Sequence, residues 1–170
     1  VERTEVIKGR DAIYERGYEV YSRAKTDKLT VIDGSGVELS LRDFSSTNIE
    51  LKKRGVRVRY LTNITGQNLD IVEEMSKQSE VRHIDKLPFR CLLTETEAMF
   101  SWVPVKDMPE VAIHSNIPEL VRMIWAMAEN AWNNAVDAQA RIDEIREGKR
   151  IGRISEPIIE YLSKDQKTTM

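Results

Sequence analysis

The sequence predicts an α/β fold in which a mixed β-sheet carries helices on both faces and is followed by a long C-terminal helix. Over the first half of the chain, short β-branched segments alternate with segments of helical periodicity, which indicates parallel strands covered by helices. Further short apolar segments then follow one another directly, which indicates added antiparallel strands. Beyond residue 117, apolar residues recur at steps of three and four over about 30 residues, as in a long helix.

Each element is assigned from its own local pattern. Helices are recognised by apolar residues at three- and four-residue steps, and Gly55 directly follows one of them, a usual place for glycine. Strands are recognised by short apolar or β-branched runs bounded by turn residues. The predicted helices are 11–25, 39–54 and 68–77, and the predicted strands are 28–32, 56–61, 80–84, 89–93, 98–103 and 111–114.

The predicted strand at residues 56–61 alternates apolar and basic side chains. This alternation is typical of a strand with one buried face. We therefore expect Arg57 and Arg59 on its solvent face, with contact to a ligand as the alternative.

The C-terminal segment carries a heptad-like seam. Its residues are Ile117, Val121, Ile124, Ala128, Ala131, Ala135, Ala138, Ile142 and Ile145. A straight helix of this length would extend about 45 Å, beyond a domain of roughly 34 Å diameter. The seam predicts either a helix that folds back on its own sheet, with Trp125 and Trp132 covering it, or a homodimer through the second half. We divide the chain into an α/β domain at 1–116, the packing or signalling helix at 117–148, and a tail at 149–170 with a short helix.

Composition limits the kinds of partner. Charged residues make up 32% and apolar residues 41% of the 170, which is typical of one globular domain with an extension. A formal net charge of −2 gives no overall attraction to a polyphosphate, so we expect no direct nucleic-acid contact.

Cellular location is predicted from the cysteine content and the hydropathy. Cys91 is the single cysteine, which excludes an internal disulfide and suits the cytoplasm. No apolar run approaches the roughly 20 residues of a membrane span, so no membrane contact is expected. The chain begins at Val1 without methionine, from which we expect a piece of a longer protein.

Motifs for catalysis, metal binding and cofactor binding are absent from the sequence. There is no HExxH, no G-x-S-x-G, no Walker A and no G-x-G-x-x-G pattern, so we predict no catalytic residues, no metal site and no cofactor. His83, beside Arg82 and Asp85, is the candidate for acid/base or metal chemistry, and a hydrogen-bonded structural histidine is the reading we favour. Cys91 lies in an apolar run and is expected to pack as a small hydrophobe.

Polar side chains follow three of the predicted parallel strands. Ligands of open α/β sheets bind outside the carboxyl ends of such strands. Hydroxyl, amide, imidazole and carboxylate groups there are suited to hydrogen-bonding a small polar ligand. The expected ligand-binding residues are Asp33, Ser35, Thr62, Asn63, Thr65, His83 and Asp85.

As a set, several strings give the chain a family resemblance. It resembles the sensor domains of archaeal, especially thaumarchaeal, signal-transduction proteins, which occur beside histidine kinase modules and belong to the phospholipase-D-like group. The strings are ERTEV at 2–6, GVRVRYLTNIT at 55–65, EVRHID at 80–85, HSN at 114–116, WNNA at 132–135 and ARIDEIREG at 140–148.

The resemblance implies a phospholipase-D-like α/β fold used for sensing. Active members of that group carry H-x-K-x-x-x-x-D, whereas the corresponding strand here reads FRCLLTET at 89–96 and has none of the three chemical residues. Without the histidine nucleophile no covalent phosphoryl intermediate can form, so we expect no such activity. The relatives' proline near Asp137 is absent, and the loop at 33–36 differs from the family's forms, so the resemblance implies no particular ligand.

The sequence therefore predicts a non-catalytic sensory or regulatory domain of a signal-transduction protein. It would bind a small ligand or partner and relay through the C-terminal helix to a kinase or other output module. One alternative is a phosphodiesterase-like hydrolase using His83. The other is an effector or docking domain of an archaeal transcription regulator.

Overall fold

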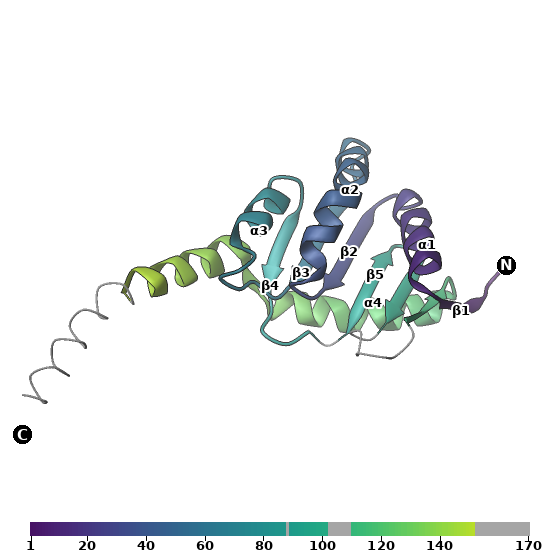
Figure 1. The fold of residues 1–170 in the computed structure, drawn as a ribbon. Helices are drawn as coiled ribbons and strands as arrows, with labels where there is room; N and C mark the ends of the chain where they lie inside the picture. Colours follow the sequence, from purple (N-terminus) through teal and green to yellow (C-terminus); the bar gives the residue numbers. More distant parts are fainter. Residues whose placement is uncertain (88, 102–109, 152–170) are drawn as a thin grey trace, which may run out of the picture.

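An eight-stranded mixed sheet forms the centre of the fold in the computed structural model, which describes residues 1–87, 89–101 and 110–151 (Figure 1). The strand order is β1-β7-β6-β5-β2-β3-β4-β8. The strands are β1 (Thr4–Lys8), β2 (Asp27–Ile32), β3 (Arg57–Thr62), β4 (Glu80–His83), β5 (Arg90–Thr94), β6 (Ala98–Ser101), β7 (Val111–Ser115) and β8 (Val136–Asp137).

The parallel part of the sheet consists of β2, β3 and β4, in which Thr30 pairs with Tyr60 and Thr62 with His83. The other neighbours, from β1 through β5 on one side and β8 on the other, pair antiparallel. The alternation of strands and helices therefore predicted the parallel part, and the consecutive strands predicted the antiparallel part. The two edge strands, β1 and β8, were not predicted from the sequence.

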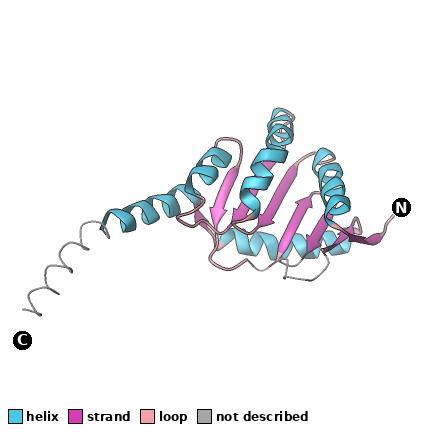
Figure 2. Cartoon of the chain, viewed as in Figure 1, coloured by secondary structure: helices cyan, strands magenta, loops and turns pink. Residues whose placement is uncertain are grey.

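Helices cover the sheet on both faces (Figure 2). On one face lie α1 (Arg10–Ser22), α2 (Gly36–Lys53) and α3 (Leu69–Ser76), and on the other lies α4 (Pro118–Asn133). Separate groups of buried apolar residues fill the two interfaces, one beneath α2 and α3 and one beneath α4. The predicted fold class is therefore confirmed.

The prediction for β3 was wrong at Arg59. This side chain is 1% exposed, while Arg57 at the strand start is exposed as expected. β3 lies between β2 and β4 with helices on both faces, so both of its alternating sets of side chains are buried. Arg59 points to the α4 face, where it lies near Trp125 and Trp132.

The predicted long helix is interrupted. α4 ends at Asn133, and a second helix covers residues 138–151 after the short strand β8. Asp137 begins this second helix, because its Oδ2 accepts hydrogen bonds from the backbone N–H groups of Gln139 (3.0 Å) and Ala140 (3.3 Å). A single straight helix of about 45 Å does not form.

The seam residues therefore contact two different faces of their own chain. Ile124 and Ala128 of α4 are buried against the sheet, with Ala131 and Ala135 packed at the margin of that group. Ala138 and Ile142 are buried in the group beneath α2 and α3, with Ile145 beside them. The alternative in which the helix covers its own sheet holds for α4, and the buried seam residues are not available to a second chain. Most of the predicted tail at 149–170 lies outside the described residues.

None of the helices within the described ranges is long and apolar enough to cross a membrane. Cys91 is buried, and burial raises the pKa of its thiol, as suits a residue that packs as a small hydrophobe.

Candidate functional site

Three loops meet at the edge of the sheet where the parallel strands end. They follow β2, β3 and β4, which are neighbours in the sheet, so the seven residues predicted for ligand binding lie along one edge. A side-chain carbon added at Gly34 would lie 3.0 Å from the Asn63 carbonyl oxygen and 3.0 Å from Asn68 Nδ2. The first two loops are therefore in close contact, and any side chain at Gly34 would push against the second loop.

Asp33 organises the first loop. Its Oδ1 accepts hydrogen bonds from the Ser35 hydroxyl (2.6 Å) and the Gly36 N–H (3.0 Å). Its Oδ2 lies 3.3 Å from Nη2 of Arg90 at the start of β5. The carboxylate thus connects the start of α2 to a neighbouring strand, and Ser35 remains exposed.

The side-chain amides of Asn63 and Asn68 hold the second loop in position. The Asn63 side chain donates to the carbonyl oxygens of Ile84 (3.3 Å) and Asp85 (3.2 Å), which joins the loop to the one after β4. Asn68 donates to the Asn63 carbonyl (3.0 Å) and accepts from the Thr65 N–H (2.9 Å). Thr62 is fully buried, and its hydroxyl oxygen has no hydrogen-bond partner in the described part of the chain.

His83 is a structural residue of this edge. It is 4% exposed, its Nδ1 accepts the Ile64 N–H at 2.9 Å, and its Nε2 donates to Asp85 Oδ1 at 2.8 Å. The bond from His83 lowers the pKa of Asp85, whose carboxylate is exposed. Both ring nitrogens of His83 therefore have hydrogen-bond partners within the chain.

Several residues of this edge were missed by the sequence analysis. Arg90 lies at the start of β5, outside the three loops, whereas Asn68 lies at the end of the β3–α3 loop, directly before α3. The signal available for Arg90 was a basic residue at the start of an apolar strand, and that strand begins at this edge because it runs antiparallel to β2.

The 138–151 helix docks on the second loop from outside. Arg141 Nε donates to the Ile64 carbonyl and Lys149 Nζ to the Gly66 carbonyl, each at 3.3 Å. Arg146 forms an ion pair with Glu73 of α3 at 2.5 Å. The loop that carries Asn63 and Thr65 is thus in contact with the other two loops on one side and with this helix on the other.

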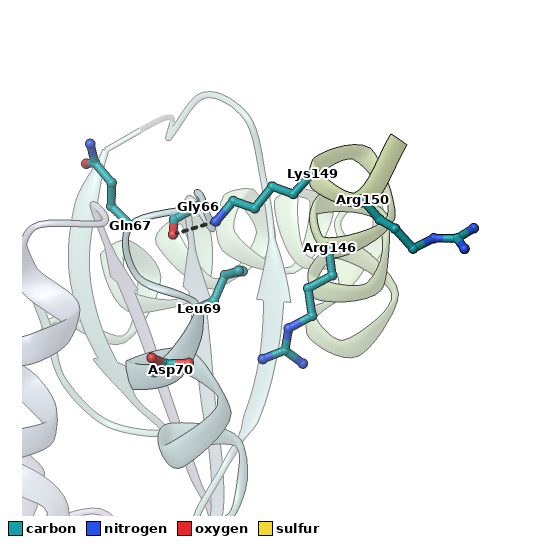
Figure 3. Close-up of a pocket in the computed structure, with 7 residues that line it drawn as sticks. All are labelled: Gly66, Gln67, Leu69, Asp70, Arg146, Lys149 and Arg150. Carbon is teal, nitrogen blue, oxygen red and sulfur yellow. Dashed lines mark hydrogen bonds between the residues drawn. The ribbon is translucent and has the colours of Figure 1, made fainter. Parts of the chain in front are cut away.

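A cavity of about 460 Å³ separates this helix from the start of α3 (Figure 3). Lys149 reaches across it to Gly66, whereas Arg150 points away from α3. Basic side chains from the helix face Asp70 and the loop backbone. Within the described ranges, no group of three or more His, Cys, Asp or Glu residues is placed to hold a metal ion.

Solved structures with the same architecture identify the fold. Nuc from Salmonella typhimurium, a phospholipase D family member, is 13% identical with a TM-score of 0.58, covering 81% of this chain and 98% of that one. NucT from Helicobacter pylori is 10% identical with a TM-score of 0.64, covering 81% and 99%. The chain has a phospholipase D-like fold. No family model and no curated protein matches the sequence.

The phospholipase D-like fold also occurs in a protein that binds DNA. TrmBL2, an archaeal chromatin protein with a novel mode of DNA binding, is 19% identical with a TM-score of 0.63 over 81% of this chain. The match covers 55% of TrmBL2, so this chain spans about half of that protein. This finding contradicts the prediction that direct nucleic-acid contact is excluded, because overall net charge did not take account of what this fold does elsewhere.

Proposed function

We propose that this chain is a non-catalytic regulatory module of a cytoplasmic signal-transduction protein. In this proposal a ligand or partner binds at the edge formed by the loops after β2, β3 and β4. The 138–151 helix then changes its contact with the β3–α3 loop and reports the event to an output module, such as a kinase.

The observation that carries the proposal is the position of the β3–α3 loop. Asn63 connects it to the loop after β4, and Gly34 brings it against the loop after β2. On its other side the same loop accepts two hydrogen bonds from Arg141 and Lys149. A ligand that prefers one loop arrangement would shift the helix by its difference in affinity between the two arrangements.

The absence of catalysis in the proposal is supported by two features. The strand that would present H-x-K-x-x-x-x-D has none of those residues, and His83 on β4 is buried with both nitrogens in hydrogen bonds. A general base must be able to reach the proton that it removes. In this proposal His83 has a structural role, because its hydrogen bonds connect the loop after β3 with the loop after β4.

Hydrogen exchange on the whole chain tests the relay. Asn63→Ala removes the bonds to the loop after β4, and we expect faster exchange both in the β3–α3 loop and in residues 138–151. Arg57→Ala is the matched control, because Arg57 lies at the opposite end of β3 in an exposed pair with Glu80. The relay is wrong if Asn63→Ala leaves exchange in 138–151 unchanged, or if the control accelerates it equally.

Hydrolysis assays test the absence of catalysis. We expect purified protein to release no product from bis(p-nitrophenyl) phosphate or from single- and double-stranded DNA. Turnover that disappears in His83→Gln, with the fold retained, would instead support the phosphodiesterase alternative.

A second candidate function is the effector or docking domain of an archaeal transcription regulator. The similarity to TrmBL2 over 81% of this chain favours it, and the basic side chains of Arg146, Lys149 and Arg150 offer a place for phosphate contacts. Fluorescence anisotropy with a labelled duplex distinguishes the two functions. DNA contact is supported if the affinity for the duplex falls steeply with salt concentration and is lower still in Lys149→Ala. If the chain does not bind the duplex at low salt, this second function is wrong.

A further inference from the structure

A second cavity, of about 360 Å³, lies between α1 and α2 on the sheet face opposite α4. Its walls are mostly apolar and aromatic. Tyr14 and Phe44 stand with ring centroids 5.3 Å apart, and Leu92 and Met99 form the floor. Gly17 of α1 lines the cavity, and a side-chain carbon there would lie 3.3 Å from the Met99 terminal methyl. The absence of a side chain at this position contributes to the open space.

The charged groups of this cavity gather at one end. Arg10 begins α1, Ser35 and Gly36 begin α2, and Arg90 begins β5, all at the edge where β2 ends. Arg10 forms no ion pair with any described residue, and Arg90 meets Asp33 at 3.3 Å. Glu110 also lines this end, so two guanidinium groups and two carboxylates meet here, and Arg10 is the guanidinium without an ion pair among the described residues. The N-terminus of the long helix α2 adds a partial positive charge.

We propose that this cavity binds a small anionic amphiphile, with its apolar chain between α1 and α2 and its carboxylate at Arg10 and Arg90. Ligand sites are mostly apolar cavities with a few polar groups that fix orientation, and this one has that distribution. Guanidinium groups match a carboxylate because they donate two parallel hydrogen bonds.

The volume limits the size of the ligand. At roughly 30 Å³ for each water-sized group, the cavity holds about 12 non-hydrogen atoms, the number in decanoate. A chain of this length would replace the space between Tyr14 and Met99 with apolar contact, while its head would reach the polar end. Decanoate is therefore the probe of choice.

This inference rests on the proposed function only for its regulatory meaning, because Ser35 belongs both to the cavity and to the sheet-edge loops. The two can fail separately. Decanoate that binds without changing hydrogen exchange in 138–151 leaves the cavity assigned and removes its connection to the relay. Absence of decanoate binding, with exchange in 138–151 still responding to Asn63→Ala, removes the amphiphile and leaves the relay.

Calorimetric titration of the whole chain with sodium decanoate, kept below micelle-forming concentrations, tests the assignment. We expect saturable one-to-one binding, at least tenfold weaker binding of decanol, which lacks the charge, and no binding of acetate, which lacks the chain. Equal affinity for decanol and decanoate, or no binding of decanoate, overturns the proposal.

Two variants locate the ligand. Gly17→Leu places a side chain in the cavity, its Cβ 3.3 Å from the flexible end of Met99, and leucine is the better helix former, so affinity should fall at least tenfold in a variant whose circular dichroism matches the parent. Arg10→Gln should weaken decanoate but not decanol. The control is Arg122→Gln, because Arg122 is exposed on α4 across the sheet. A folded Gly17→Leu or Arg10→Gln that binds decanoate like the parent chain overturns the assignment.

Discussion

Nη2 of Arg59 lies 2.6 Å from Oε1 of Glu129, which connects the middle of the sheet to α4. Arg59 is 1% exposed and also donates to Asp27 at 3.3 Å. Its guanidinium lies 5.6 Å and 5.1 Å from the ring centroids of Trp125 and Trp132, close enough for attraction between a cation and an aromatic face. Charge therefore fixes where α4 lies, in addition to its apolar packing.

Glu129→Gln should lower the free energy of unfolding by about 2 kcal/mol, because it leaves the buried Arg59 with only Asp27 as an ionic partner. Urea denaturation measures the change. Glu80→Gln removes one partner of the exposed Arg57–Glu80 pair and should cost less than about 1 kcal/mol. Equal losses of unfolding free energy in the two variants would mean that the buried Arg59–Glu129 pair stabilises the fold no more than the exposed Arg57–Glu80 pair.

Most elements of the fold could be predicted from the sequence because their patterns are local. Arg59 could not, since its partner Glu129 lies 70 positions away and alternation alone cannot show that both faces of β3 are covered. The break before residue 138 is similar. In the sequence the apolar seam continues across this break. The break depends on the pairing of β8 with β4, and no local sequence pattern indicates that pairing.

The position of the candidate site could be predicted from the sequence, but the hydrogen bonds among its residues could not. The rule for the carboxyl ends of parallel strands brought together Asp33, Asn63 and His83 correctly. Arg90 on β5 and the docking of the 138–151 helix come from elements that the rule does not address, and Asn68 ends the β3–α3 loop at a position where the sequence predicted a helix. Those partners use up much of the hydrogen-bonding capacity that the sequence analysis assigned to a ligand.

Asp137→Ala should reduce the helicity of the 138–151 segment and lower stability by about 1 kcal/mol, because two backbone N–H groups lose the carboxylate that accepts their hydrogen bonds. Circular dichroism during thermal unfolding measures both effects. Asp143→Ala is the control, since Asp143 is exposed and bonds only to the Gln139 side chain. An effect of Asp143→Ala as large as that of Asp137→Ala would contradict the capping role.

Tyr60 lies at the centre of a buried polar group beneath α2. Its hydroxyl contacts Lys28 Nζ (3.0 Å), Asn48 Nδ2 (2.8 Å) and Ser40 Oγ (3.2 Å). Burial lowers the pKa of Lys28, while the Lys28 charge, against the effect of burial, holds the pKa of Tyr60 below its usual value. The two groups therefore depend on each other.

Tyr60→Phe should cost about 1 to 3 kcal/mol of unfolding free energy, because the buried Lys28 keeps only Asn48 as a hydrogen-bond partner. Tyr18→Phe, at an exposed tyrosine of α1, should change stability by less than about 0.5 kcal/mol. Chemical denaturation at neutral pH compares the two. A Tyr60→Phe protein as stable as the parent would show that Lys28 is neutral in the folded chain and needs no acceptor.

Glu97 joins α1 to β7 at the opposite edge of the sheet. Arg23 donates two hydrogen bonds to its carboxylate, at 2.9 and 2.7 Å. Arg16 donates to Nδ1 of His114 at 3.3 Å, so the His114 Nε2–H donates to Glu97 at 2.9 Å. Burial alone would raise the pKa of Glu97, but these bonds lower it from 4.5 to about 2.

This shift predicts the acid sensitivity of the fold. Between pH 4.5 and about 2 the unfolded chain takes up a proton at Glu97 while the folded chain does not. The stabilisation by Glu97, at most about 3 kcal/mol, is therefore fully present above pH 4.5 and is lost as the pH falls toward 2. Denaturation midpoints measured across that window should decline less steeply in Glu97→Gln than in the parent chain. Parallel declines in the two proteins would assign the acid sensitivity to other carboxylates.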